Sequence, residues 1–173
     1  MEETILFILS EILRKQPYFL TMYSNSEMME ELEDICRIKV RFSEIDSMKR
    51  VWHGSYLKYF EDGRESFGLH YPGIGYQDMQ TAGIYAALYD FHVRYYAPLC
   101  INDTAVVQTR YIYKRGARID FRYKIYRERD NVLCAEGDSV QLFTDPDGNL
   151  LSLKPDFYAT WQDKFVFMTV HQD

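Results

Sequence analysis

Residues 40–64 read VRFSEIDSMKRVWHGSYLKYFEDGR, and in this stretch the sequence changes from a strand pattern to a helix pattern. Apolar and charged residues alternate up to its start, with Cys36, Ile38, Val40 and Phe42 set against Arg37, Lys39 and Arg41. A period of two is typical of a half-buried strand. Beyond Asp46 the spacing is helical, because one side carries Tyr56, Leu57, Phe60, Gly63, Arg64 and Phe67. The stretch predicts a strand, an acidic loop and a helix that runs to about Leu69 and ends before Pro72, Gly73 and Gly75.

Downstream of this helix the sequence predicts strands only, at about residues 85–96, 105–114, 117–127 and 132–144. The connections at 115–116 and 129–131 are short, so neighbouring strands run antiparallel. Phe157, Trp161 and Phe165 recur four residues apart and predict a closing helix or turn within 155–167. The fold class is therefore α+β, with a mainly antiparallel sheet wrapped around one long central helix.

Composition limits the kinds of partner that we expect. The 173 residues fit one domain, and 20 Lys and Arg against 26 Asp and Glu give a net charge of −6. Nucleic acid is not an expected partner, because a polyanion-binding surface needs a basic patch. Three widely spaced cysteines without a Cys-x-x-Cys pair favour a reducing, cytoplasmic setting. The apolar run at residues 5–9 is too short for a transmembrane segment, and Glu2 and Glu3 replace the basic start of a signal peptide.

The chain divides at about residue 34 into a helical N-terminal extension, residues 1–34, and a main domain, residues 35–173. Within the extension, residues 5–13 have the apolar spacing of an amphipathic helix, which Pro17 interrupts. A second helix is expected after Ser24, because Glu27 completes the spacing of a capping box. The alternative is that translation begins at Met28 or Met29, which would remove most of this extension.

Several common sites are not indicated. Residues 145–149 resemble the start of a calcium loop, but Leu150 stands where that loop needs glycine, so a β-turn is favoured. The four histidines lack metal-ligand spacing, and no metal is expected. Gly73 and Gly75 lack the third glycine of a dinucleotide fingerprint, and no Gly-x-Ser-x-Gly motif supports a serine hydrolase.

The 40–64 stretch resembles the 4-hydroxybenzoyl-CoA thioesterase family of hot-dog-fold acyl-CoA thioesterases. The family pattern is R-[YF]-x-[ED]-T-D-x-x-G-x-V-x-[HY]-x-x-[YF]-[LV], followed by F-E-x-[AG]-R on a helix. This chain matches it at Arg41, Phe42, Glu44, Asp46, Val51, His53, Tyr56, Leu57, Phe60, Glu61, Gly63 and Arg64. It departs from the pattern at Ile45, where the family has threonine, and at Lys49, where it has glycine. If that glycine serves a positive φ, Lys49 must strain or reshape the loop.

The resemblance implies a hot-dog fold and hydrolysis of an acyl-CoA to free acid and CoA. It places the catalytic carboxylate at Asp46, which either attacks the thioester or activates water as a general base. It also places a backbone N–H at His53, where the start of the helix can polarise the carbonyl. A role for the His53 ring stays open. Glu61 is a possible alternative carboxylate, because another branch of hot-dog thioesterases keeps its carboxylate on this helix, but a structural role paired with Arg64 is favoured.

Further residues are candidates for binding substrate. Trp52, Tyr56, Tyr59 and Phe60 suggest an apolar acyl pocket. Lys114, Arg115 and Arg118 are candidate contacts for the phosphates of CoA, although a solvated charged turn is the favoured interpretation. No cofactor is expected beyond the CoA of the substrate. The resemblance implies a homodimer or homotetramer, and the alternatives for function are an acyl-carrier-protein thioesterase and a non-catalytic module that binds acyl-CoA or a partner.

Overall fold

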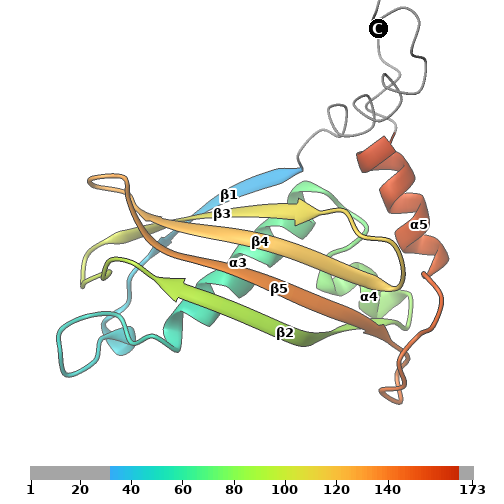
Figure 1. The fold of residues 1–173 in the computed structure, drawn as a ribbon, viewed down its shortest axis with the longest axis horizontal. Helices are drawn as coiled ribbons and strands as arrows, with labels where there is room; N and C mark the ends of the chain where they lie inside the picture. The colour runs from blue at the N-terminus through green and yellow to red at the C-terminus, as the bar shows by residue number, and fades with distance from the viewer. Residues whose placement is uncertain (1–31, 168–173) are drawn as a thin grey trace, which may run out of the picture.

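The computed structural model describes residues 32–167 (Figure 1). In chain order the elements are β1 (Glu33–Lys39), a 3-10 turn (Phe42–Glu44), α3 (Ser55–His70), α4 (Tyr76–Thr81), β2 (Tyr85–Tyr95), β3 (Thr104–Ile112), β4 (Arg118–Arg127), β5 (Val132–Thr144), α5 (Asp156–Gln162) and a π-helical turn (Asp163–Phe167).

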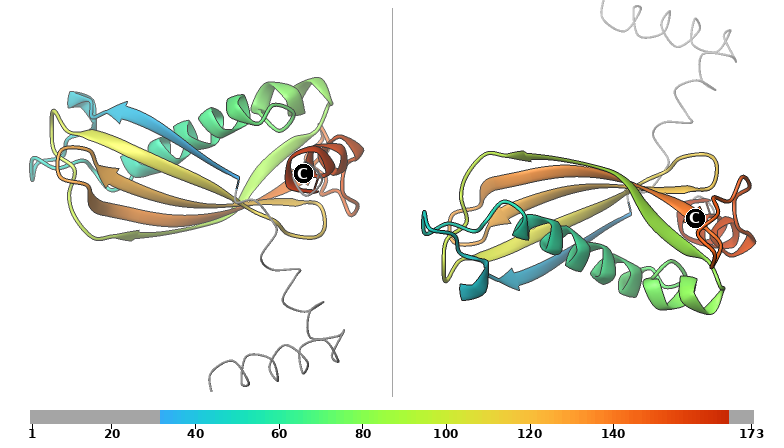
Figure 2. Two further views of the ribbon diagram at one scale, coloured as in Figure 1. Left: turned by 90° about the horizontal axis from the view of Figure 1, so that it is seen from above. Right: turned by 90° about the horizontal axis from the view of Figure 1, so that it is seen from below.

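The strands form one five-stranded sheet in the order β1-β3-β4-β5-β2, and every pair is antiparallel. Figure 2 shows the sheet curled around α3, which runs along one of its faces. This arrangement confirms the predicted hot-dog fold. The antiparallel order follows from the short connections between β3, β4 and β5, which leave no room for a crossover.

The helix face of the sheet carries the core. Side chains at alternate positions of β3 and β4 point to α3, and those of Val107, Tyr123 and Ile125 are completely buried. Gly63 lets α3 approach β3 closely, because a Cβ at this position would lie 2.5 Å from Thr109 Oγ1 and 2.9 Å from Val107 Cγ1. The predicted packing role of Gly63 is therefore confirmed.

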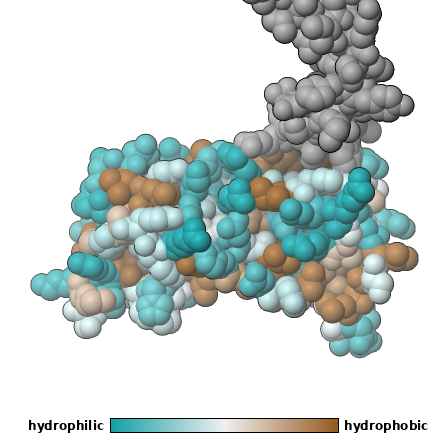
Figure 3. Space-filling model, in the orientation of Figure 1, coloured by the Kyte–Doolittle hydropathy of each residue, from teal (hydrophilic) through white to brown (hydrophobic). Residues whose placement is uncertain are grey.

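The outer face of the sheet carries ion pairs between neighbouring strands, such as Arg110–Glu33, Arg122–Asp138 and Arg94–Glu136. Figure 3 shows this face as a mosaic of hydrophilic and hydrophobic residues. Along β3 and β4 the polar residues of this face alternate with the buried residues of the helix face, and this alternation makes the strand pattern readable from the sequence.

Two sequence expectations need correction. Phe42 does not continue the first strand, because β1 ends at Lys39 and Phe42 begins the 3-10 turn with 81% of its surface exposed. The short helix α4 was not predicted, and Asp78 explains its position, because its carboxylate accepts hydrogen bonds from the N–H groups of Gly73 and Gly75 at the start of the helix.

The remaining elements agree with the sequence analysis. The four later strands lie where the pattern predicts them, and the closing helix α5 buries Tyr158 and Trp161. The helices predicted in the N-terminal extension lie outside the described residues, apart from 32–34, where the chain enters β1. The boundary at residue 34 thus stays a prediction.

Candidate active site

A short hairpin, residues 45–51, presents Asp46. Ile45 pairs with Val51, the Asp46 N–H donates to the Arg50 carbonyl at 2.8 Å, and the Lys49 N–H donates to the Asp46 carbonyl at 3.0 Å. Lys49 has a φ of +60°, the left-handed conformation that favours glycine. The expected positive φ at this position is confirmed, and lysine adopts it.

The two carboxylate oxygens of Asp46 have different surroundings. Oδ1 accepts hydrogen bonds from the N–H groups of Met48 at 2.8 Å and Arg50 at 3.3 Å. No hydrogen bond within residues 32–167 uses Oδ2. The loop therefore fixes the carboxylate through one oxygen and leaves the other available to reactants.

The start of α3 offers hydrogen-bond donors nearby. The Ser55 N–H donates to the Trp52 carbonyl at 2.8 Å, which begins the turn that becomes the helix. Among the described residues, no hydrogen bond uses the N–H groups of His53 and Gly54. Because α3 is 16 residues long, its dipole also favours negative charge here. The His53 ring is exposed and lies 5.0 Å from the Trp52 ring, measured between centroids.

A pocket of about 360 Å³ brings Asp46 and His53 together. It is lined by Asp46, Met48, Arg50, Val51, His53, Tyr56, Tyr95, Tyr96, Ala97 and Pro98. Tyr56 forms its inner wall: the phenol accepts a hydrogen bond from the Leu99 N–H at 3.2 Å, and burial raises the pKa of Tyr56 to about 12. The pocket thus combines a carboxylate, a residue with an unbonded N–H at the start of α3, and an apolar wall.

Not all predicted binding residues lie in this pocket. Tyr59 and Phe60 are buried in the core between α3 and the sheet: they share a helix face with Tyr56, but they lie one turn further along α3, beyond the pocket. Trp52 is half exposed but does not line the pocket. Of the four aromatic candidates, only Tyr56 contributes to the pocket wall.

The basic candidates lie at the other end of the sheet. Lys114 and Arg115 are in the loop between β3 and β4, and Arg118 pairs with Asp120 at 2.6 Å. The Asp46 hairpin instead contacts the segment before β3, where Leu99 accepts from the Val51 N–H. The 9 residues of β3 separate these groups by roughly 30 Å. Within one chain the structure does not bring Lys114, Arg115 and Arg118 to Asp46.

Glu61 lies in the second turn of α3, with 63% of its side chain exposed. Its carboxylate is 3.6 Å from the Arg64 guanidinium, the pairing that the sequence suggested. Arg64 is itself buried and donates to the phenols of Tyr76 and Tyr123. Glu61 does not line the Asp46 pocket.

The sequence analysis missed Tyr95, Tyr96 and Pro98, which form the wall opposite the hairpin. The Tyr95 hydroxyl donates to the His53 carbonyl at 3.0 Å, so the end of β2 holds the start of α3. The only signal in the sequence was a run of aromatic residues ending a strand before proline.

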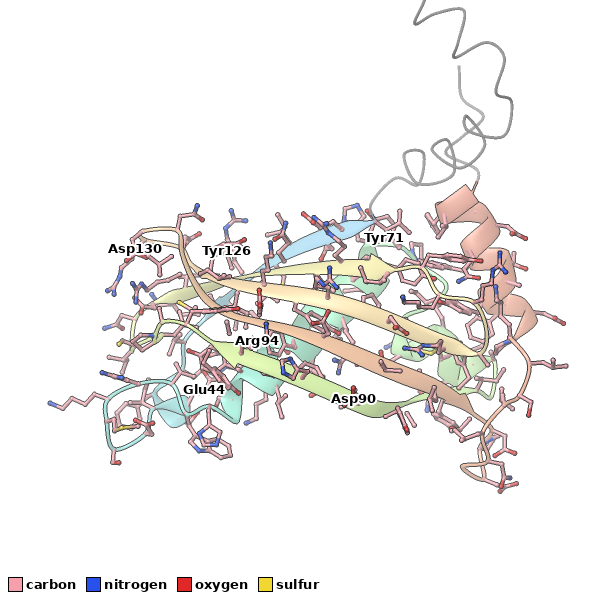
Figure 4. All side chains as sticks on the ribbon, viewed as in Figure 1. Glu44, Tyr71, Asp90, Arg94, Tyr126 and Asp130 are labelled. Atoms are coloured by element: carbon pink, nitrogen blue, oxygen red, sulfur yellow. The ribbon has the colours of Figure 1, made fainter. Side chains whose placement is uncertain are left out.

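A second cavity of about 360 Å³ lies on the outer face, where Arg94 is labelled in Figure 4. Its lining includes Arg122 with Asp138 and Arg94 with Glu136, which are paired across strands. It contains no helix start, so it lacks the donors that the Asp46 pocket has.

Within residues 32–167, no three His, Cys, Asp or Glu side chains are grouped so as to hold a metal ion. No helix in this part of the chain is long and apolar enough to cross a membrane.

Comparison with known proteins gives consistent matches. A family model described as Thioesterase-like superfamily matches residues 40–162. YneP of Bacillus subtilis (strain 168) is 35% identical over 89 residues, which are 51% of this chain and 64% of YneP, so the match spans less than two thirds of that relative. The acyl-CoA thioester hydrolase YbgC of Escherichia coli O157:H7 is 25% identical over 118 residues, 68% of this chain and 84% of YbgC. Among solved structures, a hypothetical protein from Thermus thermophilus has a TM-score of 0.67 and 28% identity, covering 74% of this chain and 96% of that one.

Proposed function

The chain belongs to the Thioesterase-like superfamily, and from this premise we propose that it hydrolyses the thioester bond of an acyl-CoA to free acid and CoA in the Asp46 pocket. The observation that carries the proposal is the presence, in one pocket, of the Asp46 carboxylate, which has a free oxygen, and of His53, whose N–H and that of the adjacent Gly54 make no hydrogen bond among the described residues. Thioester hydrolysis needs both a group that attacks or activates water and donors for the carbonyl oxygen.

Two routes use the same geometry. In the first, Asp46 Oδ2 attacks the carbonyl carbon, the C–S bond breaks, CoA leaves as a thiolate that takes up a proton, and water hydrolyses the mixed anhydride. In the second, Asp46 takes a proton from water as the water attacks, the same C–S bond breaks, and CoA leaves as a thiolate that takes up the proton held by Asp46. In both, negative charge on the carbonyl oxygen is stabilised by the N–H groups of His53 and Gly54.

The wall of the pocket suits an apolar acyl group. Val51, Tyr56, Tyr95 and Pro98 supply apolar surface, and the exposed Arg50 also lines the pocket. Its charged guanidinium is a candidate contact for the anionic CoA part of the thioester.

We also propose that the active form is a homodimer, with a tetramer as the alternative. β2 is an edge strand, and its exposed side chains include Leu88 and Tyr89. Exposed edges invite pairing with a second copy. Antiparallel pairing of two β2 strands would bring the 113–117 loop of one protomer toward the Asp46 end of its partner, which would give Lys114, Arg115 and Arg118 a route to CoA. Light scattering after size exclusion tests this, and a mass of 20.6 kDa would contradict it.

The test of the proposed function is a panel of acyl-CoA substrates with a free-thiol readout. We expect Asp46→Asn, which keeps the shape but removes the charge, to lower kcat by about 10²–10⁴-fold. Glu61→Gln is the matched control, because it changes an exposed carboxylate outside the pocket, and it should retain kcat within about threefold.

Three outcomes would change the assignment. Loss of activity in Glu61→Gln with an active Asp46→Asn would move the catalytic carboxylate to α3. Turnover of acyl-carrier-protein thioesters but not acyl-CoA would change the carrier. No turnover of either class by the wild-type protein would favour a non-catalytic binding module.

A further inference from the structure

The Asp46 hairpin is attached to α3 through both of its ends. At the first end, the Tyr59 hydroxyl donates to Glu44 Oε2 at 2.6 Å. At the second, the Val51 N–H donates to the Leu99 carbonyl at 2.9 Å, and the Leu99 N–H donates to the Tyr56 hydroxyl at 3.2 Å. Two tyrosines one helical turn apart therefore connect the hairpin to the helix that supplies the N–H donors.

Glu44 links several parts of the loop around Asp46. Its Oε2 also accepts from the Arg41 N–H at 2.8 Å, and its backbone carbonyl accepts from the Trp52 N–H at 2.8 Å. Glu44 is thus joined to the residue before His53 and lies two residues before Asp46. Figure 4 shows Glu44 at the end of the molecule where this loop meets the start of α3.

Glu44 and Tyr59 are buried outside the pocket, so they can position the site but do not contact substrate in the pocket. Glu44 is 5% exposed and Tyr59 is 1% exposed, and neither lines the pocket. A buried carboxylate is tolerated only when it accepts hydrogen bonds, and charge-assisted bonds of this kind are short and strong. Burial and the neighbouring Glu44 carboxylate raise the pKa of Tyr59, so the phenol stays protonated and remains a donor.

We propose that Glu44 and Tyr59 are positioning residues that hold the Asp46 carboxylate at its working distance from the N–H groups of His53 and Gly54. This inference rests on the proposed function. Both halves of the site meet at Glu44, because its side chain contacts α3 and its backbone contacts the segment that carries His53. A shift of about 1 Å in such a geometry can lower the rate about 10²-fold.

The test is Tyr59→Phe, which removes one hydroxyl from a buried ring and leaves its packing in place. We expect kcat to fall by about 10-fold or more while KM stays within about twofold, because the hydroxyl holds the catalytic carboxylate without touching substrate. The matched control is Tyr111→Phe. Tyr111 is also buried, and its hydroxyl lies 2.6 Å from the Tyr158 hydroxyl where β3 meets α5. Tyr111→Phe should lower the thermal midpoint about as much as Tyr59→Phe does, and it should leave kcat unchanged.

A double-mutant cycle separates positioning from general destabilisation. If Tyr59 acts through Asp46, then Tyr59→Phe should change the residual kcat of Asp46→Asn by less than about twofold. Glu44→Gln, which keeps an acceptor of the same shape without the charge, is the second variant and should show a smaller loss of kcat than Tyr59→Phe.

The outcomes are distinguishable. An inactive Asp46→Asn with a fully active Tyr59→Phe and Glu44→Gln would overturn the positioning roles and leave the proposed function standing. An equal kcat loss from Tyr111→Phe, or an undiminished loss in the Asp46→Asn background, would also overturn them. A fully active Asp46→Asn would overturn the proposed function itself, and the positioning roles with it.

Discussion

Gly63 offers the sharpest test of how closely α3 must approach the sheet. Alanine in a helix interior is normally more stable than glycine by about 1 kcal/mol, so Gly63→Ala would be stabilising on an exposed helix. Here the added Cβ would lie 2.5 Å from Thr109 Oγ1 and 2.9 Å from Val107 Cγ1. Both neighbours are β-branched, completely buried and fixed on β3, so neither can turn away freely.

The expected magnitude follows from these opposing terms. Overpacking a buried site typically costs about 1–3 kcal/mol, and two contacts this short put Gly63→Ala at the upper end of that range. After the gain of about 1 kcal/mol in helix propensity, the free energy of unfolding should fall by about 2 kcal/mol. For a chain of this size, that loss lowers the thermal midpoint by about 4–8 °C.

Thermal and urea unfolding followed by circular dichroism measure this change. Thr109→Ala provides the matched background, because it removes the nearest atom, and Thr109 Oγ1 has no hydrogen-bond partner among the described residues. In that background Gly63→Ala should cost about 1 kcal/mol less. A Gly63→Ala protein as stable as the wild type, or the same penalty in both backgrounds, would refute the argument that steric contact with β3 requires glycine.

Three further changes have defined outcomes. Lys49→Gly should raise the free energy of unfolding by up to about 1 kcal/mol, because it relieves a φ of +60°; a lower thermal midpoint would count against this. Burial and the nearby Asp34 raise the pKa of Cys36 from 9.0 to about 11, so at pH 8 its alkylation in a variant lacking Cys100 and Cys134 should be about 100-fold slower than that of an ordinary thiol. His53→Ala should keep most of kcat and His53→Pro should lose about 10-fold or more, whereas equal losses would indicate ring chemistry.

The strands were predictable because one face of the sheet is buried and the other is exposed. In β4, Ile119, Phe121, Tyr123 and Ile125 face α3, and the alternation is visible in the sequence. The same reasoning failed at Phe42, where apolar alternation continues but the chain turns into a 3-10 helix. The six residues of α4 are too few for a helical period, and the position of this helix depends on hydrogen bonds to Asp78.

The site was predictable only as far as it is local in sequence. Asp46 and His53 are close in the chain, so a motif could propose both, and the structure places them in one pocket. Tyr95 and Tyr96 reach the same pocket from the end of β2. They lie too far from Asp46 and His53 in the sequence for one motif to include all four residues. Helical periodicity placed Tyr56 and Phe60 on one apolar face, but it could not show that the pocket ends at Tyr56 and that Phe60, one turn further along α3, lies in the core.

The backbone around Asp46 shows where local preference gives way to the needs of the site. Of the described residues other than glycine, Lys49, Asn102 and Asn131 have positive φ. Asparagine tolerates this conformation, whereas lysine does so at a cost of about 1 kcal/mol. The conformation at Lys49 closes the hairpin so that the N–H groups of Met48 and Arg50 reach Asp46 Oδ1. Strain that persists against residue preference is typical of functional sites, where surrounding contacts hold it in place. Here the hydrogen bonds from Met48 and Arg50 to Asp46 Oδ1 and the pairing of Ile45 with Val51 hold the turn in place, so the strain at Lys49 is explained by a requirement on Asp46 rather than by the stability of the fold.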